Sequence, residues 1–134
     1  MINIADEVFD TVAKAVRSIH YEAKISGEYM HVPPTFPTVT LDEIQNTVVG
    51  ELEDSSKEET YAGVVYRLQV FSNKQNGKKA EARAIFATAD EVMRRLGLRR
   101  VTYTTTPEIY DSTIYSITAT YEAIVDVNGV VYRR

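Results

Sequence analysis

The sequence predicts an α+β fold, in which two α-helices pack on one face of a mainly antiparallel sheet that closes with a C-terminal β-hairpin. Three observations support this prediction. Residues 60–72 alternate apolar and polar side chains with the period of two that a half-buried strand requires. Residues 3–24 and 79–96 repeat apolar side chains every three or four positions, as amphipathic helices do. The remaining strand segments follow one another through turns, without helical crossovers. The 134 residues form one expected domain, 1–134.

The first expected element is the helix over residues 3–24. Asn3 is a candidate N-cap, and Asp6 and Glu7 suit the positive end of the helix dipole. Gly27 is the expected point at which the chain leaves the helix. The apolar stripe of this helix is formed by Ile4, Val8, Val12, Ala15, Val16 and Ile19.

Residues 25–37 hold Pro33, Pro34 and Pro37, which predict an extended connection instead of a helix or a central strand. A first strand is expected from residue 38 to 41, or as far as 44. Residues 46–60 then predict a solvated loop or a flexible hairpin, with flexibility over 46–59. Three apolar residues in it, Val48, Val49 and Leu52, indicate that part of the segment docks on a partner. Its acidic residues are Glu51, Glu53, Asp54, Glu58 and Glu59.

The long strand over 60–72 is expected to bury the face that contains Leu68, and residues 73–77 form a polar turn after it. The second helix follows over 79–96, and Gly97 supplies its C-terminal stop. Strands are then expected over 100–106, ended by Pro107, and over 112–125. Asn128-Gly129 is a strong hairpin signal that returns a last strand over 130–133. One sheet face meets the helices. The other, rich in Thr, Tyr and Arg, is expected to be free for water or another subunit.

Composition narrows the classes of function. The net charge of −4 argues against general nucleic-acid binding, which needs a basic footprint. The absence of cysteine excludes disulfides and thiolate zinc sites. The first residues, MINIADEVFD, do not resemble a signal peptide. No apolar run reaches the roughly 20 residues of a membrane helix. We therefore expect no membrane association and no specific nucleic-acid binding.

The sequence offers no recognisable catalytic, cofactor or metal site. His20 and His31 lie outside any metal-ligand pattern, which favours surface or structural roles. The carboxylates of 51–59 lack the spacing of a calcium loop, and Asn76-Gly77-Lys78-Lys79 lacks the P-loop pattern. We expect no catalytic residues, no cofactor and no metal.

Arginines form the one candidate basic patch. Arg94 and Arg95 end the second helix, Arg99 and Arg100 begin the next strand, and residues 133–134 are also arginines. They are expected to converge on one edge as a subunit contact or as solvated side chains. An acidic surface at 51–59 and an arginine surface on one subunit favour head-to-tail contacts. Charge reversal at Arg99 and Arg100 is therefore expected to slow assembly and make it more sensitive to salt.

The order of these segments resembles the tail terminator family of long-tailed bacteriophages, together with the related tail-completion and head-tail joining proteins. The resemblance rests on FPTVTLDEI, on the strand YAGVVYRLQVFSNK and on the helix segment ADEVMRRLG, and it covers nearly the whole chain. It implies a non-enzymatic virion protein that forms a homo-oligomeric ring, a hexamer, at the junction of tail and head. The implied partners are the tail tube protein and a head-completion or connector protein, with assembly in the host cell cytoplasm.

Two other classes of function stay open at this point. A small intracellular protein-binding or adaptor module could use the exposed sheet face. The third class is an enzyme, which would need a catalytic site that no motif in the chain indicates. Hydrodynamic mass separates the first alternative from a ring.

Overall fold

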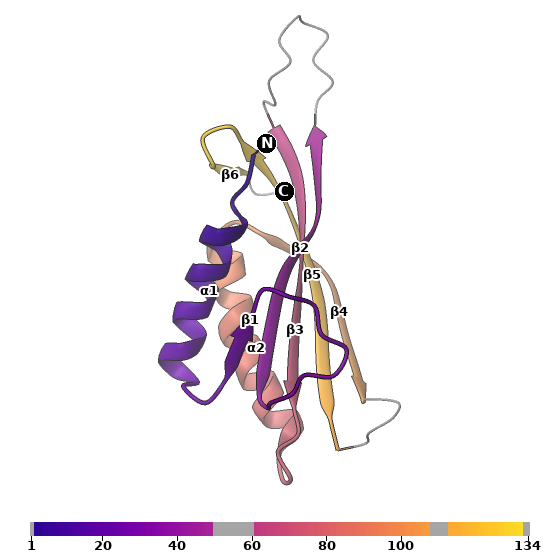
Figure 1. Cartoon of the computed structure of the whole chain (residues 1–134). Helices are drawn as coiled ribbons and strands as arrows, with labels where there is room; N and C mark the ends of the chain where they lie inside the picture. The colour runs from indigo at the N-terminus through magenta and orange to yellow at the C-terminus, as the bar shows by residue number, and fades with distance from the viewer. Residues whose placement is uncertain (1, 50–60, 108–112, 133–134) are drawn as a thin grey trace, which may run out of the picture.

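The computed structural model describes residues 2–49, 61–107 and 113–132. Their fold is α+β, as predicted from the sequence. Figure 1 shows two helices on one side of a long sheet. In chain order the elements are α1 (Ala5–Ile19), β1 (Lys24–Ser26), β2 (Thr38–Val49), β3 (Tyr61–Ser72), α2 (Lys78–Arg95), β4 (Arg99–Pro107), β5 (Tyr115–Asp126) and β6 (Val131–Tyr132).

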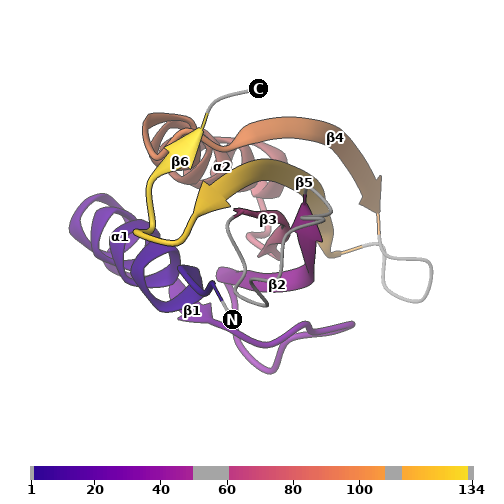
Figure 2. The ribbon, with the colours of Figure 1, turned by 90° about the horizontal axis from the view of Figure 1, so that it is seen from above.

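The sheet has six strands in the order β1-β2-β3-β5-β4, and β6 also pairs with β5. β1 is parallel to β2, whereas every other pairing is antiparallel. β4 and β6 share one edge of β5, because β4 pairs with residues 115–122 and β6 with residues 124–125. The sheet is strongly curved, and β4 wraps towards the side of α2 (Figure 2).

The core lies between the helices and one face of the sheet. Leu68 on β3 and Ile117 on β5 are fully buried, and so are Val12 on α1 and Ile85 on α2. The alternation predicted for β3 and β5 is confirmed, since the residues expected on the helix-facing side of β3 are buried: Ala62, Val64, Tyr66, Leu68 and Val70. Apolar burial of this extent is the main source of the stability of a domain of this size.

Two physical constraints favour glycine at position 97, directly after α2. The φ of Gly97, 92°, lies in the left-handed region, which a residue with a Cβ adopts only at a cost. A Cβ atom there would also stand 3.0 Å from the Val131 Cγ1 atom of β6. The helix stop predicted from the sequence therefore also makes room for the last strand.

The first helix is shorter than predicted. It ends at Ile19 instead of residue 24, and the Ile19 side chain is 65% exposed although it was assigned to the buried stripe. Residues 24–26, expected in the helix and the connection, instead form β1, which pairs with the start of β2. Three residues are too few to display an alternation, so pairing with β2 determines this strand. Gly27 consequently follows β1 and is not the helix exit.

The start of α1 lies one residue later than predicted. Ile4 occupies the N-cap position, but the Asn3 Oδ1 atom accepts a hydrogen bond from the Ala5 backbone N–H at 2.9 Å. Asn3 thus still binds one of the free N–H groups at the helix start, as side chains before a helix commonly do.

β2 extends to Val49, so residues 46–49 belong to a strand paired antiparallel with β3, which agrees with the hairpin alternative and not with the solvated loop. Each is paired with a residue of β3, as far as Val49 with Tyr61. Composition does not reveal this part of the strand, because the strand depends on its pairing with β3 and not on a local sequence pattern. The rest of the segment that was predicted to be flexible, residues 50–59, lies outside the described residues.

The predicted C-terminal hairpin is confirmed, with a last strand that begins one residue later than expected. Gly129 has a φ of 79°, and the Asp126 carboxylate accepts hydrogen bonds from the backbone N–H groups of Asn128 and Val130, both at 2.9 Å. The described part of the strand covers Val131 and Tyr132, where a strand over 130–133 was expected. Arg133 and Arg134 lie outside the described residues, so their predicted contribution to a basic patch lies there too.

Truncation of Leu68 tests the placement of the core. We expect Leu68→Ala to lower the free energy of unfolding by about 2–5 kcal/mol, because the side chain is fully buried and its loss leaves a cavity. Val48→Ala is the control, since Val48 is exposed on β2 and its truncation should change stability by about 0.5 kcal/mol or less. Chemical denaturation measures both, and equal losses would contradict the assigned sheet faces.

Candidate assembly interface

The four described arginines of the predicted patch lie where α2 ends and β4 begins. Arg95 pairs with Glu91 at 2.8 Å, Arg99 with Glu122 at 3.6 Å and Arg100 with Asp90 at 3.2 Å. The predicted proximity of helix end and strand start is therefore present. Acidic neighbours balance much of the charge, however, so this region is a network of ion pairs and not a uniformly basic surface.

Asp90 is the central group of this network. It is a buried carboxylate on the core side of α2, and its Oδ1 atom accepts a hydrogen bond from the Tyr121 hydroxyl at 2.6 Å as well as one from Arg100. Burial raises the pKa of the Tyr121 hydroxyl well above its usual value, and the hydrogen bond to Asp90 raises it further. Such charge-assisted hydrogen bonds are stronger than neutral ones, so they fix β4 and β5 against α2.

A second tyrosine–carboxylate pair lies at the opposite edge of the sheet. The Tyr66 hydroxyl of β3 donates a hydrogen bond to Glu43 Oε1 of β2 at 3.0 Å. Burial raises the pKa of Tyr66 far above the ordinary value for tyrosine, and the charge of Glu43 adds to this shift. Tyr66 and Tyr121 are direct cross-strand partners. The sheet thus has two adjacent buried tyrosines, one hydrogen-bonded to Glu43 on the neighbouring strand β2 and the other to Asp90 on α2.

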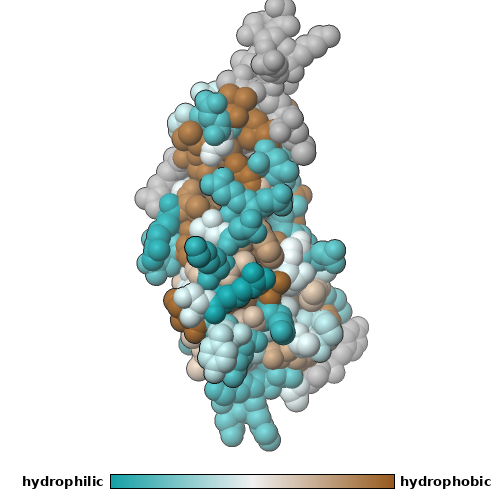
Figure 3. Space-filling model, turned by 60° about the vertical axis from the view of Figure 1, so that its left-hand side comes forward, coloured by the Kyte–Doolittle hydropathy of each residue, from teal (hydrophilic) through white to brown (hydrophobic). Residues whose placement is uncertain are grey.

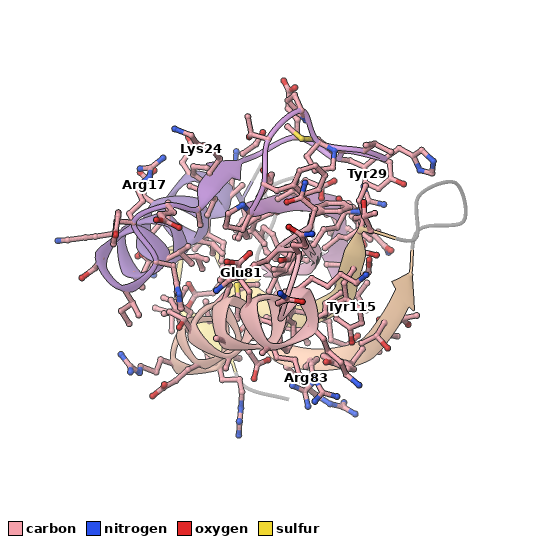
Figure 4. All side chains as sticks on the ribbon, turned by 90° about the horizontal axis from the view of Figure 1, so that it is seen from below. Arg17, Lys24, Tyr29, Glu81, Arg83 and Tyr115 are labelled. Carbon is pink, nitrogen blue, oxygen red and sulfur yellow. The ribbon has the colours of Figure 1, made fainter. Side chains whose placement is uncertain are left out.

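The sheet face away from the helices was expected to be free, and this expectation is wrong in part. The segment between β1 and β2 crosses it. The Tyr29 ring lies 4.2 Å from Arg67 Cζ, and Gln69 is bonded to the backbone of Met30. Tyr29 and the helix residue Glu81 lie on opposite sides of the sheet (Figure 4). A threonine-rich strip on β4 and β5 remains partly or fully exposed: Thr102, Thr104, Thr118 and Thr120.

Both long edges of the sheet have an open stretch within the described parts of the chain. On β2 this stretch lies between Leu41, whose carbonyl is next to Gly27, and Asn46, whose Nδ2 atom donates a hydrogen bond to the Ile2 carbonyl at 2.8 Å. β1 covers only residues 38–40 of β2, and β4 pairs with β5 alone. Each open edge contains an irregularity in its register, next to Ile44 on β2 and next to Val101 on β4. Ile44 is 44% exposed and Val101 is 50% exposed. An open edge with exposed apolar side chains is a typical site for strand pairing with another chain.

The helix layer carries a shallow groove of about 610 Å³ between α1 and α2. Lys14 and Asp10 line it on α1, and Arg95 and Leu96 line it at the end of α2. In Figure 3, apolar residues are concentrated in the upper half of the face shown, whereas its lowest part is hydrophilic. Exposed apolar residues include Val48 near the end of β2, and Val127 and Val130 between β5 and β6.

No group of three or more His, Asp or Glu side chains stands close enough to hold a metal ion in residues 2–49, 61–107 and 113–132. His20, which was expected to be structural or at the surface, shares a hydrogen bond of 2.9 Å with Thr88 and so joins the end of α1 to α2. Within the same ranges, no helix is long and apolar enough to cross a membrane. The predicted acidic contacts Glu51, Glu53, Asp54, Glu58 and Glu59 lie outside the described residues.

No protein-family model matches the chain, and no curated protein sequence matches it.

Sequence reasoning missed the residues that organise this surface. Asp90 interrupts the apolar side of the second helix between Ala89 and Val92, and that interruption was the available signal. Glu43 was visible only as one polar residue in a strand of uncertain length. Ile44 and Val101 are exposed because they lie on edge strands, and the irregular pairing beside them depends on the neighbouring strands.

The buried tyrosines predict how stability depends on pH. In the unfolded chain they ionise near pH 10, whereas in the folded chain they stay protonated, so the unfolded state binds fewer protons above that pH. We therefore expect the free energy of unfolding to fall as the pH rises above 10. The slope should be smaller in the double variant Tyr66→Phe/Tyr121→Phe, measured by denaturation at a series of pH values. Tyr21→Phe is the control, since Tyr21 is exposed and should leave the slope unchanged.

Proposed function

We propose that this protein is a tail terminator, or a close tail-completion relative, of a long-tailed bacteriophage. The proposal starts from the resemblance in segment order and adds the fold, in which two helices cover one face of an antiparallel sheet. In this role, copies of the chain form a ring, taken as a hexamer, that caps the tail tube, ends its elongation and offers a surface to the head. The protein would then be located in the virion at the tail-head junction.

The observation that carries the proposal is the pair of open sheet edges on opposite sides of one subunit. A ring needs heterologous contacts, in which one surface of a subunit meets a different surface of the next. The β2 edge contains Asp42 and Glu43, and the β4 edge contains Arg99 and Arg100. Two unlike edges meet this requirement. Asp42, Arg99 and Arg100 each have an oppositely charged partner within the subunit, so the difference between the edges lies in their residue types more than in net charge.

The titratable residues of the described chain support a structural role. Asp90 and Glu43 are each engaged by a buried tyrosine, and Asp42 forms an ion pair with Arg67 at 2.8 Å. These contacts hold strands and helices together. They do not converge on a cleft in which a substrate would meet an acid, a base or a nucleophile.

A second candidate function is a protein-binding or adaptor module that uses the exposed sheet face. One observation favours it: the threonine-rich strip on β4 and β5 stays accessible beside the part of the face that Tyr29 covers. Such a module has no need to form a ring. Hydrodynamic mass at increasing protein concentration distinguishes the two, because the adaptor reading expects a monomer that binds another protein.

Tails assembled without this protein test the proposal directly. We expect tubes of variable length that fail to join heads, because nothing caps the growing end. Electron microscopy measures the distribution of tail lengths and the fraction of tails attached to heads. Restoring the wild-type chain in trans is the control and should return both to normal. Tails of fixed length that still join heads without the protein would contradict the proposal.

A further inference from the structure

We infer that the open edge of β4 in one copy pairs with the open edge of β2 in the next copy, so that the sheet continues across the subunit boundary. This inference deepens the proposed ring and rests on it, because it names the contact by which neighbouring copies would be joined. It is drawn from strand direction, from the alignment of residues across the sheet and from the charge and exposure of both edges.

Strand direction is compatible with this contact. β3 is antiparallel to both β2 and β5, and β4 is antiparallel to β5, so β2 and β4 run in opposite directions. When a second copy is placed beside the first without being inverted, its β2 lies next to β4 and runs against it. The new pair is therefore antiparallel, like the pairs on either side of it, and can form the usual hydrogen-bond ladder.

The open parts of the two edges also lie in the same rows of cross-strand partners. Successive cross-strand partners form one row that runs from Glu43 on β2 through Tyr66 and Tyr121 to Arg100 on β4. A parallel row runs from Leu41 through Leu68 and Ala119 to Tyr103. The uncovered stretches 42–45 and 99–102 therefore lie at similar heights on opposite edges, and they can meet without a large shift between neighbouring copies.

The ends of the first row carry side chains of opposite charge, and Arg100 also pairs with Asp90 of its own copy at 3.2 Å. Glu43 and Arg100 lie on the same, helix-facing side of the sheet, since their cross-strand partners Tyr66 and Tyr121 are both core residues. Within one copy they are separated by two strands. Between two copies joined edge to edge, they become neighbours on one face. Cross-strand pairs of opposite charge stabilise a sheet, whereas like charges in the same positions oppose pairing.

Both edges bulge at this level and expose an apolar side chain there. The register shifts beside Ile44, immediately after Glu43, and beside Val101, immediately after Arg100. Bulges on edge strands commonly prevent uncontrolled pairing. Here, however, each bulge presents a β-branched apolar residue to solvent. Burying Ile44 against Val101 of the next copy would remove both from water, which favours association.

Engineered cysteines test this contact cleanly because the natural chain has no cysteine. Ile44→Cys and Val101→Cys are made separately and together in the full chain, and each protein is oxidised over a range of concentrations. Within one copy the two positions are three strand spacings apart, roughly 14 Å along the sheet, too far for a disulfide. We expect the double variant to form a ladder of covalent multimers. An equal mixture of the single variants should form covalent dimers, and neither should do so alone.

The outcomes separate the contact from the function. Efficient dimers of Val101→Cys or Ile44→Cys alone would overturn the inference, since they indicate a two-fold contact between like edges. A double variant that forms no covalent multimers at the highest soluble concentration would overturn it as well. Tail length is judged independently. Irregular tails without the protein, together with no covalent multimers, would support the proposed function and contradict only this contact. Covalent multimers together with normal tails in the absence of the protein would support the contact and contradict the proposed function.

A charge variant gives a second measurement. Glu43→Gln retains an acceptor for the Tyr66 hydroxyl but removes the charge that faces Arg100 of the next copy. We expect the association constant and the cross-linking rate to fall about two- to fivefold, with a weaker dependence on salt. Glu91→Gln is the matched control, because Glu91 pairs with Arg95 on the exposed side of α2 and should leave both unchanged. Equal effects of the two variants would contradict the inference.

Discussion

The hydrogen bond between Tyr121 and Asp90 is the contact on which the arrangement of the other elements depends. It joins the central strand β5 to α2 inside the core, and Arg100 adds the edge strand β4 to the same carboxylate. A buried carboxylate without partners would be strongly unfavourable, so the tyrosine and the arginine must both be present for the helix to pack in this position. The curvature that brings β4 towards α2 in Figure 2 is consistent with this attachment. The ring contact between Phe86 and Tyr103, with centroids 5.0 Å apart, extends it along β4.

The same attachment gives the two sheet edges different mechanical characters. β4 is fixed from one side by α2 through Asp90 and Phe86, while its other side faces outward. β2 is fixed to β3 over its full length, but beyond Thr40 its outer edge has no strand beside it in the described ranges. One edge is thus attached to a helix, whereas the other is attached to the N-terminal segment by the hydrogen bond from Asn46 to the Ile2 carbonyl. A subunit with two different edges has the unlike surfaces that heterologous association uses.

Much of the fold was predictable because its determinants are local. Alternation along β3 and β5, the apolar stripe of α2, the stop at Gly97 and the hairpin signal at Asn128-Gly129 all depend on near neighbours in the sequence. The errors occur where distant residues decide. β1 exists because of its pairing with Thr38–Thr40, and the end of β2 persists because β3 runs alongside it. The arginine cluster was found from the sequence, but its neutralisation by Asp90, Glu91 and Glu122 was not, since only the ion pair within α2 lies within one helical turn. The bulges at Ile44 and Val101 leave no trace in composition or periodicity.

The paired tyrosines at the centre of the sheet also make the molecule its own optical probe. The chain contains no tryptophan, so its near-ultraviolet signal comes from nine tyrosines and the weaker phenylalanines. Two of these tyrosines, Tyr66 and Tyr121, are held rigidly in the core and hydrogen-bonded to carboxylates, whereas Tyr21 and several others face solvent. Rigid, asymmetric surroundings give an aromatic ring its near-ultraviolet circular dichroism, and loss of packing abolishes it even when secondary structure survives. Circular dichroism in the near ultraviolet therefore monitors the core packing around Tyr66 on β3 and Tyr121 on β5 without any added label.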